Sequence, residues 1–317
     1  MTPRLLLLTL LVPACAASQR PSSARPPRRF VLVTQAAALR TAPDAGGAAL
    51  TLTHPGPFAF RRVRARGDVV ELETVAAPER QCAAAIVPPA GMRLRFYTTT
   101  RALGQAVARP LHLSGPEGSL TVAVGTPVRE AADGVSLEVA HAGLRVSLRE
   151  APSVARAFAE PHAETPVERA ERLRPGTRAL LPDGAAVTVG DDAQVMVFLR
   201  SPMLQGAHVV VATPCVRFEG TVPSSAVLPV LDLELGDASR ARLPRRVIRA
   251  GARLQWPGAG PAGRTVAAVP LTDEGTAVGA LRCFLVPLRV HGATVEPPPE
   301  VTVCAAAADV QEAGEET

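Results

Sequence analysis

Histidines and paired carboxylates are the residues that most often carry catalysis or bind metals, and in this chain they are dispersed. No histidine falls in a His-Glu-x-x-His pattern, and no serine stands in a Gly-x-Ser-x-Gly turn. The six histidines are His54, His112, His141, His162, His208 and His291. The acidic pairs Asp191 with Asp192 and Asp232 with Glu234 fit a turn and an exposed strand face, where water solvates them. We therefore expect no enzyme activity, no cofactor and no metal site. One alternative stays open, an exported hydrolase whose triad is assembled from distant segments.

Arginine supplies the basic side chains, because the chain holds 34 basic residues and no lysine. Arg62, Arg64 and Arg66 alternate, so on a strand they would share one face, with Arg61 on the other. A second cluster comprises Arg240, Arg242, Arg245, Arg246 and Arg249. Guanidinium groups bind phosphates and carboxylates bidentately, so either set suits lipopolysaccharide or an acidic partner. The competing interpretation is that exposed strands need polar residues, which here are arginines. The net charge of +5 is modest and predicts no nucleic-acid partner.

The aromatic content is low, with a single tryptophan and a single tyrosine. Trp256, in Gln255-Trp256-Pro257-Gly258, has two interpretations. It is either a stacking residue for a ligand or a residue of the hydrophobic core beside a turn.

The cysteines agree with an oxidising compartment, since four remain once Cys15 is set aside. We favour a disulfide between Cys283 and Cys304, because the segment between them can return as an antiparallel strand pair. Cys82 and Cys215 would then pair or stay buried as small apolar residues. A zinc site is not expected, because no two cysteines have the spacing of zinc ligands.

The N-terminus reads as an export signal. An apolar run from Leu5 to Val12 is too short for a membrane-spanning helix and is typical of a signal peptide. The ending Pro13-Ala14-Cys15 resembles the bacterial lipobox, which implies a lipid on Cys15 and, with Ala16 after it, an outer-membrane location. Ordinary secretory cleavage is the alternative, because Ala14-Cys15-Ala16 also fits it. Residues 1–29 are thus expected to be a signal peptide and a flexible tether rich in proline, serine and arginine.

Short apolar runs separated by turn residues predict an all-β fold with short connecting helices. The expected strands are Phe30–Thr34, Arg62–Ala65, Val69–Leu72, Arg93–Tyr97, Leu120–Val124, Val135–Val139, Leu144–Leu148, Val195–Leu199, Val209–Ala212 and Val216–Phe218. Turns are expected at Arg66-Gly67-Asp68 and Pro182-Asp183-Gly184, among others. The one helix with clear signals begins at Thr165, with Pro166 and Glu168 in its first turn, and ends by Pro175-Gly176.

Two spans resemble bacterial SH3-like domains. In the first, Val31-Leu32-Val33-Thr34 is followed by Leu39-Arg40-Thr41-Ala42-Pro43, similar to the family's LR-x-x-P element. In the second, residues 178–228, Leu181-Pro182-Asp183-Gly184 opens the span and Phe218-Glu219-Gly220-Thr221-Val222-Pro223 closes it. Thr221 stands where the family has tryptophan. The resemblance implies tandem small SH3-like β-barrels and a non-catalytic module that binds cell-wall material or partner proteins.

The expected organisation follows from these segments. After the tether come β-domains at 30–103, 104–160, 161–236 (with the short helix) and 237–310, and then an acidic tail at 311–317. We expect a cell-envelope lipoprotein that binds or scaffolds, docking an envelope protein partner. The alternative is an arginine-mediated binder of an anionic envelope polymer, with Arg62, Arg64, Arg66 and Trp256 as candidate binding residues and the membrane contacted through the N-terminal lipid.

Overall fold

The computed structural model describes residues 29–44, 47–50, 56–131, 134–139, 144–148, 152–161, 171–190, 195–203, 206–229, 244–258, 260–291 and 299–313. These residues form 29 β-strands and six 3-10 helices of three residues each, so the predicted all-β class is confirmed. None of these helices is long and apolar enough to cross a membrane. The predicted lipid site Cys15 and most of the predicted tether lie outside the described residues.

An antiparallel meander begins the fold. Its strands are β1 (Arg29–Val33), β2 (Phe58–Arg66), β3 (Val69–Glu73) and β5 (Met92–Thr99), each paired with the next. Three 3-10 helices lie in this part of the chain: η1 (Ala36–Ala38), η2 (Pro78–Arg80) and η3 (Thr100–Ala102). Gly67 turns the β2–β3 hairpin with a φ of +58°, which glycine adopts without steric cost.

The C-terminal strands extend this same sheet. Its elements are β22 (Arg253–Trp256), β23 (Gly260–Thr265), β25 (Thr276–Val278), β26 (Leu281–Pro287) and β28 (Glu300–Ala306). β23 pairs with β5, β22 with β23 and β28, and β28 with β26. Smaller pairings join β4 (Ala85–Val87) to β27 (Arg289–His291), and β21 (Arg246–Ile248) to both β24 (Val269–Leu271) and β29 (Val310–Glu312), which follows η6 (Ala307–Asp309).

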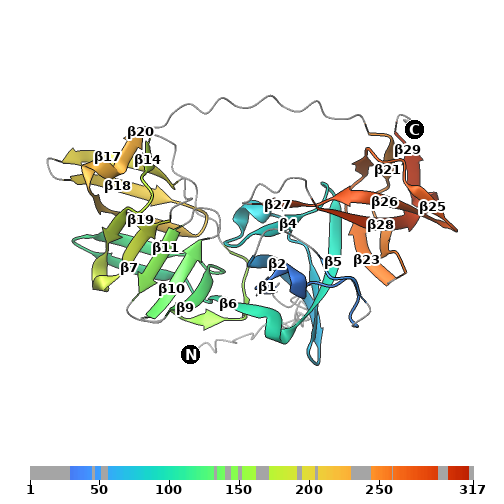
Figure 1. Cartoon of the computed structure of the whole chain (residues 1–317), viewed down its shortest axis with the longest axis horizontal. Coiled ribbons are helices and arrows are strands. Elements are labelled where there is room, and N and C mark those ends of the chain that lie inside the picture. The colour runs from blue at the N-terminus through green and yellow to red at the C-terminus, as the bar shows by residue number, and fades with distance from the viewer. Residues whose placement is uncertain are drawn as a thin grey trace, which may run out of the picture.

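One hydrophobic cluster therefore contains both ends of the described chain. It includes Phe60 and Phe96 from the meander and Trp256 and Phe284 from the C-terminal strands. We call this part the first lobe; Figure 1 shows β21 to β29 beside β5 on one side of the molecule. The first and the last of the four expected β-domains thus share a core, while the expected boundaries themselves stay a prediction.

The second lobe is built from the middle of the chain. One set of strands comprises β6 (Leu103–Val107), β9 (Pro127–Ala131), β10 (Gly134–Val139), β11 (Leu144–Leu148), β12 (Val154–Ala155), β13 (Ala157–Phe158), β15 (Arg178–Leu180) and β16 (Ala186–Val189), with η4 (Pro182–Gly184). A seven-stranded sheet comprises, in order, β20 (Val227–Pro229), β14 (Glu171–Leu173), β17 (Val195–Met203), β18 (Gly206–Ala212), β19 (Val216–Val222), β8 (Gly118–Val122) and β7 (Leu111–Gly115), with η5 (Ser224–Ala226) before β20. Their shared core includes Val146, Val187 and Phe218.

One local arrangement occurs three times. A strand leads into a 3-10 helix, and the helix continues into the next strand with no residue between them, in β5-η3-β6, β19-η5-β20 and β28-η6-β29. In each case the last strand pairs with an earlier one, β6 with β1, β20 with β14 and β29 with β21.

The helix predicted from Thr165 to about Pro175 is wrong in the part that the structure describes. Thr165, Pro166 and Glu168 lie outside the described residues, but Glu171–Leu173 is strand β14. β14 pairs with both β17 and β20, so pairing on two edges overrides the local helix signals.

Candidate functional site

The predicted arginine triplet on β2 is interrupted by a β-bulge. Arg62 lies opposite Leu72 and Arg64 opposite Glu71, with Val63 as the extra residue between them. The bulge puts Arg64 and Arg66 on the face of Arg61 and moves Arg62 to the other face. The expectation that Arg62, Arg64 and Arg66 share a face is therefore wrong, although all three are exposed. Their role in binding stays a prediction.

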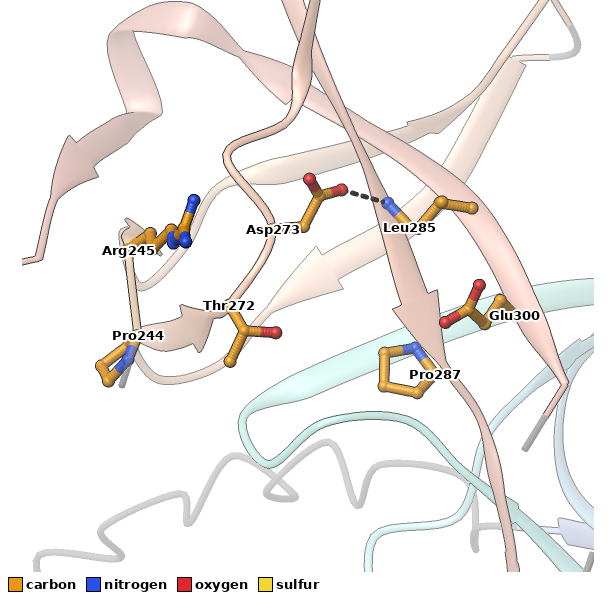
Figure 2. A pocket seen from close by; sticks show the side chains of 7 residues that line it. All are labelled: Pro244, Arg245, Thr272, Asp273, Leu285, Pro287 and Glu300. Carbon is orange, nitrogen blue, oxygen red and sulfur yellow. Dashed lines mark hydrogen bonds between the residues drawn. The ribbon is translucent and has the colours of Figure 1, made fainter. Parts of the chain in front are cut away.

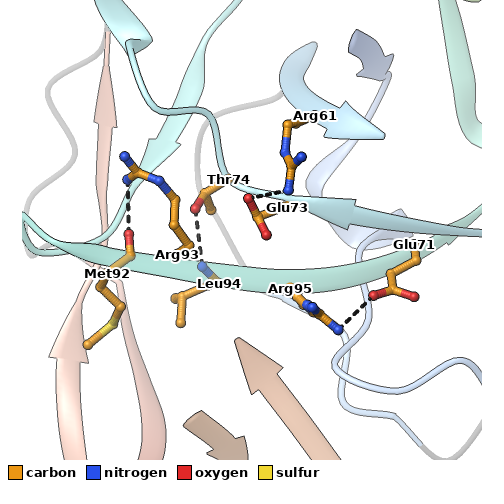
Figure 3. A network of polar contacts seen from close by, with 8 residues as sticks. All are labelled: Arg61, Glu71, Glu73, Thr74, Met92, Arg93, Leu94 and Arg95. Carbon is orange, nitrogen blue, oxygen red and sulfur yellow. Dashed lines mark hydrogen bonds and ion pairs between the residues drawn. The ribbon is translucent and has the colours of Figure 1, made fainter. Parts of the chain in front are cut away.

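Two buried glutamates form ion pairs with arginines of β2. Glu73 accepts a hydrogen bond from Arg61 at 2.6 Å, and Glu71 forms an ion pair with Arg95 at 3.0 Å (Figure 3). Glu71 also forms an ion pair with Arg64. The side chain of Glu71 is 3% exposed, so its charge needs these partners. Burial, and next the charge of Glu71, raise the pKa of Tyr97, while Arg95 and Arg64 oppose the shift.

The other predicted binding residues have structural roles. Trp256 is 4% exposed and its ring lies 5.6 Å from that of Phe96 in the first-lobe core, which is the place of a core residue. Of the second arginine cluster, Arg245 pairs with Glu274 at 3.1 Å and Arg246 with Glu312 at 2.7 Å, while Arg240 and Arg242 lie outside the described residues.

Both cysteine pairs lie at disulfide distance. Cys283 and Cys304 face each other on β26 and β28, in the antiparallel pair that the sequence predicts. Cys82 pairs with Cys215, 133 residues away, and both belong to the core of the second lobe. Because Cys82 lies between η2 and β4 of the first lobe, this bridge joins the two lobes, which the pairing of β1 with β6 and β13 also connects.

Three arginines align across three adjacent strands of the first lobe. Arg253 on β22 lies directly opposite Arg264 on β23, and Arg264 lies directly opposite Arg93 on β5. Neighbouring strands are about 4.8 Å apart, and opposed residues share a face, so three like charges stand in a row. Arg93 turns its guanidinium onto the carbonyl of Met92 at 3.1 Å, whereas Arg95 points to Glu71 (Figure 3). We call Arg253, Arg264 and Arg93 the arginine ladder.

A hollow of about 520 Å³ lies beside the ladder. It is lined by Arg95, Arg253, Leu254, Gln255, Gly260, Pro261, Gly263 and Arg264. Gly263 is required here, because its φ is +144° and a Cβ would lie 1.9 Å from the carbonyl oxygen of Arg93. We call this space the arginine hollow.

The charge in the arginine hollow is not neutralised from within. No side chain among the described residues forms an ion pair or hydrogen bond with Arg253 or Arg264, and no carboxylate lines the hollow. Arg95 gives one nitrogen to Glu71, while its buried Nε has no partner. Guanidinium groups in this arrangement can bind phosphate or carboxylate oxygens.

A second hollow, of about 780 Å³, has mixed charge (Figure 2). Asp273, Glu300 and Arg245 line it, but Asp273 accepts hydrogen bonds from the backbone N–H groups of Leu285 and Gly275, and Arg245 pairs with Glu274. These contacts fix a loop rather than supply an acid and a base. In the described part of the chain, no three His, Cys, Asp or Glu side chains gather as metal ligands.

Comparison with protein-family models, curated proteins and solved structures finds no match. The sequence carries a signal for part of the arginine hollow, since Arg93-Leu94-Arg95 alternates on a predicted strand. The sequence does not predict the strand pairing that brings Arg253 and Arg264, about half the chain away, beside Arg93.

Proposed function

We propose that this chain is a non-catalytic binding protein that holds a polymer bearing phosphate or carboxylate groups at the arginine hollow. The observation that supports the proposal is the pair Arg253 and Arg264, directly opposed, exposed and without an acidic partner among the described residues. Such a pair costs free energy in the unbound protein, and an anion between the guanidiniums removes that cost. The arginine hollow differs from the set Arg62, Arg64 and Arg66, because Arg64 of that set already forms an ion pair with Glu71.

The cellular setting is part of this proposal. We infer that the protein is exported, and that it is anchored by a lipid on Cys15 or released after simple signal cleavage. Two cysteine pairs at disulfide distance support an oxidising compartment. We therefore propose that the ligand is an anionic polymer of the cell envelope, because an exported protein is located in the same compartment. Mass spectrometry of the mature N-terminus tests this part, because a lipoprotein begins at an acylated Cys15, whereas signal cleavage after Ala16 removes Cys15 and leaves Ala17 as the first residue.

We further propose that the fold consists of tandem SH3-like units. The thrice-repeated strand, 3-10 helix and strand supports this, because each repeat ends in a strand that pairs back onto an earlier strand. Units of this kind serve as binding modules, which fits the proposed binding role.

Binding to polyphosphate and to polygalacturonate, measured by titration calorimetry, tests the proposed ligand class. The double variant Arg253→Gln/Arg264→Gln should weaken binding by about tenfold per arginine, since a charge-assisted hydrogen bond contributes about 1.5 to 3 kcal/mol. The control Arg174→Gln/Arg178→Gln makes the same charge change at two exposed arginines of the second lobe. Equal affinities for the two double variants would reject the proposal.

A further inference from the structure

A third hollow, of about 620 Å³, lies in the first lobe beside the mixed-charge hollow, with which it shares Thr272, Leu285 and Pro287, and we call it the proline groove. It lies where the segment around η2 and β4 meets β24, β26 and β27. Its apolar walls include Val75, Val87, Leu271 and Leu285. Leu285 is 53% exposed, which is high for a leucine within a strand. A volume of this size is typical of small-molecule sites.

The polar groups of the proline groove carry one sign of charge. Arg93 and Arg289 line it, and no lining residue is acidic. Arg289 is exposed and forms no side-chain contact with the described residues, and Arg93 reaches only the carbonyl of Met92. The groove therefore combines apolar walls with two available guanidinium groups. The adjoining mixed-charge hollow of Figure 2 shares Thr272, Leu285 and Pro287 with the groove, but its acidic residues Asp273 and Glu300 do not line the groove.

The backbone of the groove excludes an added peptide strand. An incoming strand needs free N–H groups on the exposed edge of β26, beyond its pairing with β25. The N–H of Leu285 already donates to the carboxylate of Asp273 at 2.9 Å, and Pro287 has no N–H. Pro78, Pro88 and Pro89 on the opposite wall lack this donor too. The edge is closed in the way that natural sheets avoid strand addition.

We propose that the proline groove binds a small amphiphilic anion, an acyl carboxylate whose chain lies on the apolar walls and whose head group meets Arg289. Burial of the chain supplies about 0.8 kcal/mol per methylene. The guanidinium forms charge-assisted hydrogen bonds with the carboxylate. This site is separate from the arginine hollow and does not depend on the proposed polymer.

Titration calorimetry with decanoate, below the concentration at which it forms micelles, tests the site. Decanoate should bind, whereas acetate, which lacks the chain, and decyltrimethylammonium, which has the opposite charge, should not. Arg289→Gln should weaken decanoate binding about tenfold, as expected for one charge-assisted hydrogen bond. Binding of decyltrimethylammonium as tight as that of decanoate, or no decanoate binding at all, would overturn the proposal.

Leu285→Asp places a carboxylate in the groove and should abolish decanoate binding. Leu180→Asp is the matched control, because Leu180 is 64% exposed on β15 of the second lobe. The fluorescence of Trp256 and the circular dichroism spectrum report whether each variant folds. Polyphosphate binding by Arg289→Gln should equal that of the wild type, so failure at one site is distinguished from failure at the other. Decanoate binding unchanged in a folded Leu285→Asp variant would contradict the proposal.

Discussion

Arg253 and Arg264 lie directly opposite each other on β22 and β23, with both side chains exposed and no carboxylate from the described residues between them. Like charges opposed across a strand pair destabilise a sheet by a few tenths of a kcal/mol. Elsewhere on this face the protein avoids such repulsion, since Glu73 accompanies Arg61 and Glu71 accompanies Arg64. The repulsion between Arg253 and Arg264 therefore lowers the stability of the sheet, while the same two charges favour the binding of an anion.

Replacing one member by an acid should raise stability and remove binding together. In Arg264→Glu the new carboxylate faces Arg253, so the free energy of unfolding should rise by about 0.5 kcal/mol. Polyphosphate binding should fall at least tenfold. Urea unfolding followed by Trp256 fluorescence measures the first quantity, and calorimetry the second. Arg178→Glu, opposite Thr188 on β16, is the control and should change neither. A less stable Arg264→Glu protein would show that the opposed arginines are not under strain.

The response of binding to salt should depend on the same two arginines. Raising sodium chloride from about 0.05 M to about 0.2 M shortens the screening length and weakens attraction between exposed charges. Wild-type affinity for polyphosphate should fall over this range. The slope should be shallower for Arg253→Gln/Arg264→Gln than for Arg174→Gln/Arg178→Gln. Identical slopes in the two variants would place the bound phosphates elsewhere on the protein.

The class of fold could be predicted from the sequence because many of the strands carry their own local signal. Val69–Leu72 is rich in valine and leucine, Arg93 to Phe96 alternate in polarity, and Gly67 supplies the turn between β2 and β3. The pairing of β5 with β23 has no such signal. Residues 92–94 pair with residues 263–265, and neither segment has a sequence feature that identifies the other as its partner. The arginine ladder depends on that pairing. The sequence therefore shows the individual arginines but does not predict that they lie side by side.

The arginine triplet on β2 shows a second limit. Alternation predicts a common face for Arg62 and Arg64 only if the strand is regular, and one extra residue reverses the facing of everything after it. The bulge at Val63 does this, and as a result Arg64 reaches Glu71. Trp256 is ambiguous for a different reason. A tryptophan before a turn fits both a binding face and a core, and the long-range contact with Phe96 decides between them.

Tyr97 is the only tyrosine, so its ionisation can be followed directly in the near-ultraviolet absorbance. Its pKa is raised above 10.0, first by burial and then by the charge of Glu71. A group whose pKa is higher in the folded state contributes stability that is complete below pH 10 and is lost as pH rises through the folded pKa. Arg95 opposes the shift, so Arg95→Gln should move the titration midpoint further upward. A midpoint that moves down would contradict the placement of Arg95 beside Glu71 and Tyr97.

The bridge between Cys82 and Cys215 should couple the unfolding of the two lobes. It closes a loop of 133 residues, far longer than the 21 residues between Cys283 and Cys304. Longer loops lose more entropy in the unfolded chain, so Cys82→Ala/Cys215→Ala should cost about 2 to 5 kcal/mol and Cys283→Ala/Cys304→Ala less. Trp256 lies in the first-lobe core, whereas circular dichroism reports both lobes. In urea the two signals should coincide for the wild type and separate when Cys82 and Cys215 are replaced, because the lobes then unfold at different concentrations. Coincident transitions in that variant would mean that the pairing of β1 with β6 and β13, and the packing of Phe30 with Phe158, hold the lobes together without the bridge.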